Sequence, residues 1–162
     1  MLKEIKNYNY VHATDFDFKA LCGLLIKEDY SSAVDRIQIL AKEIQTTALS
    51  FNKNSYTRNI IVNNKKCWLG LICWDKGAIT SIHGHPDQSF FYVIQGSLEC
   101  RNFDNNSLNM PKLSELDYGE YIYSQGIKGK MDNYIHQIKA KQKSISLHYY
   151  SDDPRKGEVF DI

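Results

Sequence analysis

The spacing of apolar residues changes near residue 50, and this change limits the possible folds more than any other feature of the chain. Upstream of it, apolar residues recur with the period of an α-helix. A first helix is expected to begin after Thr14 or Asp15. Its apolar face consists of Phe18, Leu21, Leu24 and Leu25.

A second helix is expected to follow Ser31 and Ser32, because Ser32 and Asp35 resemble a capping box. Its apolar stripe consists of Val34, Ile37, Leu40, Ala41, Ile44 and Ala48. The two helices are expected to form an N-terminal cap over residues 1–50.

The rest of the chain has the pattern of short β-strands. They are expected at residues 58–62, 67–74, 79–83, 89–94, 97–103, 119–123, 133–139 and 144–150. The polar residues 104–118 are expected to form a loop or a loose hairpin. Many short strands separated by turns favour a mainly β fold, a jelly-roll barrel over residues 51–152. We expect one domain, residues 1–162, whose barrel interior can hold a small ligand.

The composition argues against several kinds of partner. The 162 residues carry 20 basic and 19 acidic side chains, so no charge excess favours nucleic acid or an anionic membrane. No apolar core of a signal peptide is present near Met1, and no apolar run approaches the roughly 18–20 residues that span a bilayer. The four cysteines form no Cys-x-x-Cys pair. We expect them to be reduced and structural, in a soluble cytoplasmic protein.

The five histidines include one pair with the spacing of metal ligands. His83 and His85 lie two residues apart in an expected strand, residues 79–88, so their side chains point to the same face. Two imidazoles on one face can bind one metal ion. The alternative is two unrelated polar residues at a strand end, so the pair alone is weak support.

The residues around this pair make it more specific. The spacing Gly77-x5-His83-x-His85-x3-Ser89-x6-Gly96 resembles the first motif of the cupin barrels. Ser89 occupies the position where most cupins have a glutamate ligand. A site in this chain is therefore left with histidines only.

The third ligand has to come from His12, His136 or His148. His136 is favoured because it lies in an expected strand near the place of the second cupin motif, although the Pro-x-Gly of that motif is absent. Three histidines leave open positions on iron(II) for a substrate and O2. They could equally hold zinc for hydrolysis, so the ligand count does not decide the metal.

Four segments of the chain resemble the cysteine dioxygenase family of cupin thiol dioxygenases. They are Tyr56-Thr57-Arg58-Asn59, Leu71-Ile72-Cys73-Trp74, the stretch from Ser81-Ile82-His83 to Gly96-Ser97-Leu98, and Ser146-Leu147-His148-Tyr149-Tyr150-Ser151. Their order and separation agree with the family from about residue 50 to residue 152. Cupins in general lack the first and the last of these segments.

The resemblance implies a role for each matching residue. The ligands of Fe(II) would be His83, His85 and His136. The substrate-binding residues would be Arg58, Tyr56, His148 and Tyr150, with Arg58 pairing with a carboxylate. The catalytic relay would be Ser146, His148 and Tyr150, with the phenol placed over the open iron positions.

Strand periodicity agrees with such a relay. Ser146, His148 and Tyr150 alternate with less polar residues and form a polar line on one face. A polar line inside a barrel has to be hydrogen-bonded. The alternative is a hydrogen-bond ladder with a purely structural role.

The implied reaction converts L-cysteine and O2 to cysteine sulfinic acid. Arg58 favours cysteine, because the related 3-mercaptopropionate dioxygenases usually carry glutamine there. Animal members have a cysteine at the position of Ser89, cross-linked to the tyrosine that matches Tyr150. Serine cannot form this link, which is typical of bacterial-type members.

Three alternatives stay open at this point. They are a dioxygenase for another thiol such as 3-mercaptopropionate, a non-catalytic cupin that binds a metal or small effector, and a zinc-dependent hydrolase or isomerase. Both a monomer and a homodimer are compatible with the sequence.

Overall fold

The computed structural model describes residues 16–44, 49–104 and 107–161. Within these ranges two N-terminal helices precede two antiparallel β-sheets, which confirms the expected mainly β barrel with a helical cap. The helices are α1 (Phe18–Ile26) and α2 (Tyr30–Glu43). Neither is both long and apolar enough to cross a membrane, and no other helix in these ranges is.

Each sheet has five strands. The first sheet contains, in spatial order, β1 (Tyr56–Asn63), β2 (Trp68–Trp74), β9 (Ser144–Tyr150), β4 (Gln88–Gln95) and β7 (Tyr121–Gln125). The second contains β10 (Val159–Phe160), β3 (Ile82–His85), β8 (Asn133–Ala140), β5 (Ser97–Asp104) and β6 (Ser107–Asp117). A short 3-10 helix, η2 (Pro154–Lys156), connects β9 to β10.

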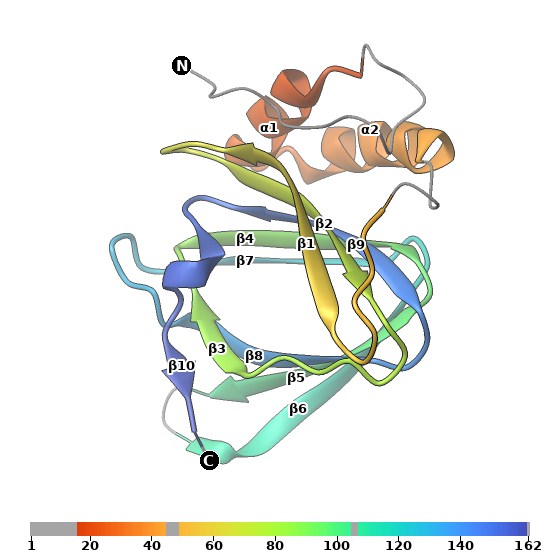
Figure 1. Cartoon of the computed structure of the whole chain (residues 1–162). Coiled ribbons are helices and arrows are strands. Elements are labelled where there is room, and N and C mark those ends of the chain that lie inside the picture. Colours follow the sequence, from red (N-terminus) through yellow and green to blue (C-terminus); the bar gives the residue numbers. More distant parts are fainter. Residues whose placement is uncertain (1–15, 45–48, 105–106, 162) are drawn as a thin grey trace.

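The helices cover the outer face of the first sheet (Figure 1). For this reason β2 and β9 are buried at every residue: one face meets the helices and the other faces the barrel interior. The outer cluster includes Leu21, Leu25, Ile37 and Leu40 from the helices and Leu69, Leu71, Leu147 and Tyr149 from the sheet. The alternate residues of the same strands are therefore free to build an interior site.

Both helices begin at an aspartate. The Asp17 carboxylate accepts a hydrogen bond from the backbone N–H of Ala20, and Asp29 accepts one from the N–H of Ser32. The expected start after Ser31 and Ser32 is wrong, because Asp29 already caps the helix and both serines lie in its first turn. Thr14, Asp15 and Ala48 lie outside the described residues.

Of the loop or loose hairpin expected over residues 104–118, the structure has the hairpin: β6 occupies residues 107–117 and pairs antiparallel with β5. This strand lies at the edge of its sheet and pairs only with β5. An edge strand tolerates a proline such as Pro111 and exposed charges such as Lys112, because one of its sides needs no partner. Its composition therefore resembles that of a loop.

The strand expected over residues 79–88 is shorter in the structure. Only Ile82–His85 forms β3, while Ile79 makes an isolated bridge to Lys139. Pro86, which has no backbone N–H, follows His85 and separates β3 from β4. The metal-ligand candidates of this strand therefore lie at its C-terminal end.

Replacing Ile37 by alanine is expected to lower the free energy of unfolding by about 2–5 kcal/mol, because this side chain is fully buried under the first sheet. Ile39, in the same helix, is 57% exposed. Ile39→Ala should change the free energy by less than about 0.5 kcal/mol. Urea denaturation of both variants measures the difference, and equal destabilisation would contradict the docking of α2.

Candidate metal centre

Three histidines converge inside the barrel. His83 and His85 come from β3 and His136 from β8, where His83 and His136 are direct partners across the antiparallel pair. One ring nitrogen from each lies within 4.8 Å of the other two, and the ring centroids are 4.4–4.8 Å apart. The structure thus brings together the three residues that the sequence predicts as ligands.

Hydrogen bonds fix which nitrogen of two of these rings faces the centre. The Nδ1 atoms of His83 and His85 lie 2.9 Å from the carbonyl oxygens of Ser81 and Tyr134. A carbonyl only accepts, so each Nδ1 carries the proton and each Nε2 keeps a lone pair. This is the tautomer that binds a metal through Nε2.

The Nε2 atoms of His85 and His136 are buried and have no hydrogen-bond partner among the described residues. Unpaired buried polar atoms are costly and need an explanation. A metal ion shared with His83 supplies one. The residues therefore fit a metal held by three imidazoles.

Burial keeps these imidazoles neutral. Desolvation, assisted by the nearby ring of His83, lowers the pKa of His85 to about 3. Desolvation also lowers the pKa of His136 well below its usual value, and that of His83 less strongly. Neutral imidazole is the form that coordinates a metal, so no proton has to leave at neutral pH.

The predicted relay is present beside the three histidines. In β9 the Ser146 Oγ lies 2.7 Å from His148 Nε2, and His148 Nδ1 lies 2.8 Å from the Tyr150 hydroxyl. The relay has one further member that the sequence analysis missed. The indole Nε1 of Trp74, in β2, donates to Ser146 Oγ at 2.9 Å.

Trp74 gives the relay a direction. An indole N–H can only donate, so Ser146 Oγ accepts from Trp74. Among the described contacts of Ser146 Oγ, His148 Nε2 is the one acceptor for its own hydrogen, which favours a bond donated to His148. Neutral His148 then carries its proton on Nδ1 and donates to the Tyr150 oxygen. The hydroxyl hydrogen of Tyr150 is left to donate elsewhere.

Tyr150 lies against the metal-ligand candidates. Its ring stacks on His85, with centroids 5.3 Å apart and an interplanar angle of 15°. Burial raises the pKa of Tyr150, while the positive charge of Arg58 lowers it to a smaller extent. The phenol therefore stays protonated and can act as a hydrogen-bond donor at this place.

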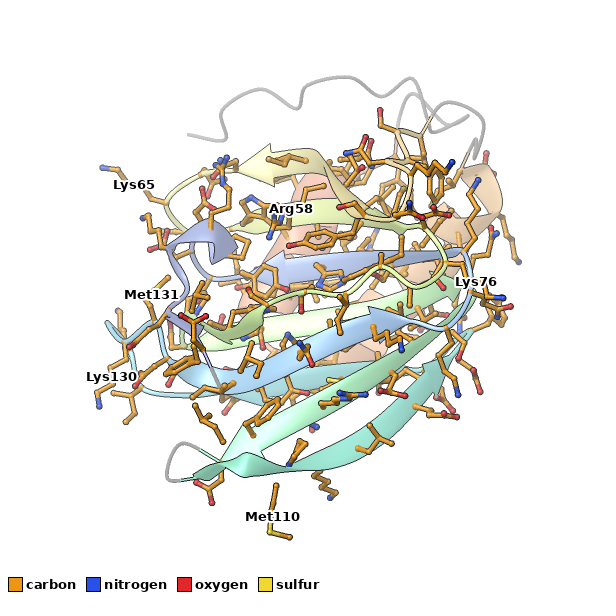
Figure 2. The ribbon with its side chains drawn as sticks, turned by 60° about the horizontal axis from the view of Figure 1, so that its bottom comes forward. Arg58, Lys65, Lys76, Met110, Lys130 and Met131 are labelled. Carbon is orange, nitrogen blue, oxygen red and sulfur yellow. The ribbon has the colours of Figure 1, made fainter. Side chains whose placement is uncertain are left out.

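Arg58 and Tyr56 lie together on β1, and the guanidinium carbon of Arg58 is 5.2 Å from the Tyr56 ring centroid. Arg58 is exposed. Desolvation is the main cause of the lowered pKa of His83 and His148, and the charge of Arg58 adds to it in both. Figure 2 shows Arg58 on the same half of the barrel as Lys65.

Ser89 lies next to Tyr150, its direct partner across the β4–β9 pair. Its hydroxyl contacts that of Ser124, in β7, at 2.5 Å. The position that carries a cysteine in animal relatives is therefore beside the phenol, and here it holds a hydrogen-bonded serine.

Tyr134 was not predicted as part of the site. Its φ is 47°, a left-handed conformation that costs roughly 1–3 kcal/mol for a bulky residue. In this conformation its carbonyl accepts from His85 Nδ1, and the Asn133 side chain donates to the His85 carbonyl at 3.3 Å. In the sequence, the only sign of this feature is that the Pro-x-Gly of the second cupin motif is missing before His136. That departure does not predict the left-handed backbone of Tyr134.

Cys100, in β5, is the remaining neighbour that the sequence analysis missed. Its Sγ lies 3.5 Å from His136 Nδ1 and 3.8 Å from the Tyr134 hydroxyl. Burial raises the pKa of this thiol to about 11, so it stays protonated. The contact depends on the register between β5 and β8. In this register Asn102, two residues after Cys100, is the cross-strand partner of His136.

Comparison with solved structures defines the class of fold. A protein with a double-stranded β-helix domain from Klebsiella pneumoniae has a TM-score of 0.55 and 13% identity, covering 72% of this chain and 93% of its own. A cupin superfamily protein from Desulfitobacterium hafniense has a TM-score of 0.53 and 13% identity, covering 66% and 86%. The fold is that of a cupin.

The family follows from sequence comparison. The model of cysteine dioxygenase type I matches residues 26–161, and the chain belongs to this family. Cysteine dioxygenase type 1 of Rattus norvegicus is 34% identical over 110 residues, and that of Danio rerio 27% over 142. The matches cover 62% and 79% of this chain and 53% and 70% of the relatives. The chain thus spans about half the length of the rat protein.

His136→Ala is expected to weaken the binding of Co(II) or Fe(II) by at least about 100-fold, because loss of a residue that only hydrogen-bonds a metal ligand already costs about 10–100-fold. His148→Ala should change it by less than about 10-fold, because the nitrogens of His148 bond Ser146 and Tyr150. Titration followed by metal analysis of the desalted protein compares the two. Loss of binding in His148→Ala alone would contradict the ligand set.

The metal-free protein is expected to lose stability as pH falls from 7 to 5. The folded chain holds the pKa of His85 at about 3, against 6.5 in the unfolded chain. Between these values the unfolded state binds more protons, so the free energy of unfolding decreases with falling pH. Urea denaturation at several pH values measures this slope. It should be smaller in His85→Asn, and a flat profile would contradict neutral burial.

Proposed function

We propose that the chain is an iron(II)-dependent thiol dioxygenase that converts L-cysteine and O2 to cysteine sulfinic acid. The observation that carries this proposal is the convergence of three neutral imidazoles, two buried and one half-buried, beside the hydroxyl of Tyr150. Membership of the cysteine dioxygenase type I family supports the same reaction class.

His83, His85 and His136 would hold iron(II), which would supply the binding of a thiolate and of O2 and the transfer of oxygen to sulfur. A glutamate ligand is absent because Ser89 occupies its usual place and bonds Ser124 instead. Three neutral ligands leave the full positive charge of the ion to stabilise a thiolate.

Arg58 binds the substrate carboxylate, because its planar fork donates two parallel hydrogen bonds. Tyr56 supports the guanidinium from β1. Tyr150 donates its hydroxyl hydrogen toward the reacting atoms, and His148 holds the phenol oxygen in place. Ser146 and Trp74 hold His148 in the tautomer that this requires.

The proposed setting is cysteine metabolism in the cytoplasm. The substrates are small molecules, and neither nucleic acid nor a membrane is a proposed partner. The acting unit is one cupin domain over residues 1–162, as a monomer or a homodimer.

The test is anaerobic reconstitution with Fe(II), followed by oxygen uptake on adding L-cysteine and identification of the product by mass. The proposal expects a gain of two oxygen atoms on sulfur. Uptake only with 3-mercaptopropionate or another thiol would overturn the assigned substrate. No uptake with any thiol would favour a non-catalytic cupin, and activity restored by zinc alone would favour a hydrolase or isomerase.

Arg58→Ala is expected to lower kcat/KM for L-cysteine by a factor that corresponds to a loss of on the order of 2–4 kcal/mol in transition-state stabilisation. The reason is that the substrate carboxylate loses its charged partner. Lys65 is an exposed cation on the same half of the barrel (Figure 2). Lys65→Ala is the matched control and should leave kcat/KM within about 2-fold of the parent. Steady-state oxygen uptake compares them, and equal values for all three proteins would contradict the role of Arg58.

Trp74→Phe is expected to lower kcat about 3- to 10-fold, because Ser146 loses the donor that sets the direction of the relay. Iron content should not change. Trp68→Phe is the control: within the described ranges its indole Nε1 is buried without a hydrogen-bond partner, while its ring, like that of Trp74, is fully buried. If both variants lose the same activity, the ring and not the N–H bond is responsible.

A further inference from the structure

Two of the four cysteines meet each other outside the proposed active site. Cys22 lies on the buried face of α1, and Cys67 immediately precedes β2. Their Sγ atoms are 2.7 Å apart, although 45 positions separate them in the chain. Both side chains are almost completely buried, with exposed fractions of 3% and 1%. The contact therefore connects the helical cap to the barrel.

The distance between the two sulfurs is shorter than an ordinary non-bonded contact. Heavy atoms that only touch are most stable roughly 3.5–4 Å apart, and a disulfide bond is about 2.05 Å long. The remaining gap is about 0.65 Å. The other two cysteines have no thiol neighbour: Cys73 Sγ accepts from the Asn59 side chain, and Cys100 Sγ lies beside His136.

We propose that Cys22 and Cys67 are a site of reversible disulfide formation that fastens α1 covalently to the start of β2. The structure contains both residues as free thiols, which corresponds to the reduced form. This inference does not depend on the proposed dioxygenase activity, because neither sulfur contacts a residue of the metal centre among the described contacts.

The oxidant belongs to the class of low-molecular-weight disulfides, such as cystine. The thiolate of one cysteine attacks the disulfide and releases one small thiol, which leaves a mixed disulfide on the protein. The second cysteine then displaces the second small thiol and forms the intramolecular bond. The protein loses two electrons and two protons, and the small disulfide gains both.

Burial sets the rate of this exchange. The hydrogen bond that the Cys67 thiol donates to Cys22 Sγ and the apolar surroundings both raise the pKa of Cys67, so little thiolate forms in the closed structure. Exchange therefore requires α1 to move away from the sheet. A bond closed in this position restrains the start of β2, where the Trp68 ring lies 5.7 Å from that of Tyr150.

The test uses the full chain, reduced, desalted and incubated with cystine at mildly alkaline pH, with and without urea below the unfolding midpoint. Intact mass without reductant should fall by two hydrogens, and peptide mapping should link Cys22 to Cys67. Closing a loop of this length should raise Tm by roughly 5–15 °C, reversibly on reduction. The linked peptide should persist in Cys73→Ser and disappear in Cys22→Ser and Cys67→Ser.

Two outcomes would overturn the proposal. One is the absence of the linked peptide in both buffers, whether or not mixed disulfides form. The other is a link that involves Cys73 or Cys100. Circular dichroism and metal content of Cys22→Ser and Cys67→Ser verify that the variants are folded, so that a missing link reflects the missing thiol.

Discussion

Three neutral imidazoles, those of His85 and His136 buried and that of His83 half-buried, converge where β3 and β8 pair, and the surrounding residues supply the hydrogen bonds that this burial requires. Each ring needs a partner for Nδ1 so that Nε2 can face its neighbours. The carbonyls of Ser81 and Tyr134 provide two of these partners, and the thiol of Cys100 lies beside the third ring. The left-handed backbone at Tyr134 is one consequence, because it places a carbonyl against His85. A metal ion satisfies the nitrogens that remain.

The first sheet supports this centre because its outer face packs against the helices while its inner face carries polar side chains of the site. Its outer face packs against α1 and α2 through apolar residues, which buries that side of β2 and β9. Its inner face carries the line from Trp74 through Ser146 and His148 to Tyr150. A buried line of this kind is stable only when every member is hydrogen-bonded. The helical cap thus contributes to the precision of a site that it does not touch.

Much of this arrangement could be predicted from the sequence. The His83–His85 spacing and the alternation around His148 identify side chains on one face of a strand, and this geometry needs no tertiary information. The missed features depend on tertiary contacts. The edge position of β6 explains its loop-like composition, and the left-handed Tyr134 is stabilised by a ring from another strand. The Cys22–Cys67 contact joins segments whose sequences carry no motif.

The central claim is that three histidines hold a metal that binds a thiol directly. X-ray absorption at the iron edge, recorded on the reconstituted protein before and after L-cysteine is added without O2, tests it most directly. We expect scattering from three imidazoles in both samples and a new sulfur ligand only after cysteine is added. Fewer than three imidazoles, or a spectrum without sulfur at saturating cysteine, would contradict it.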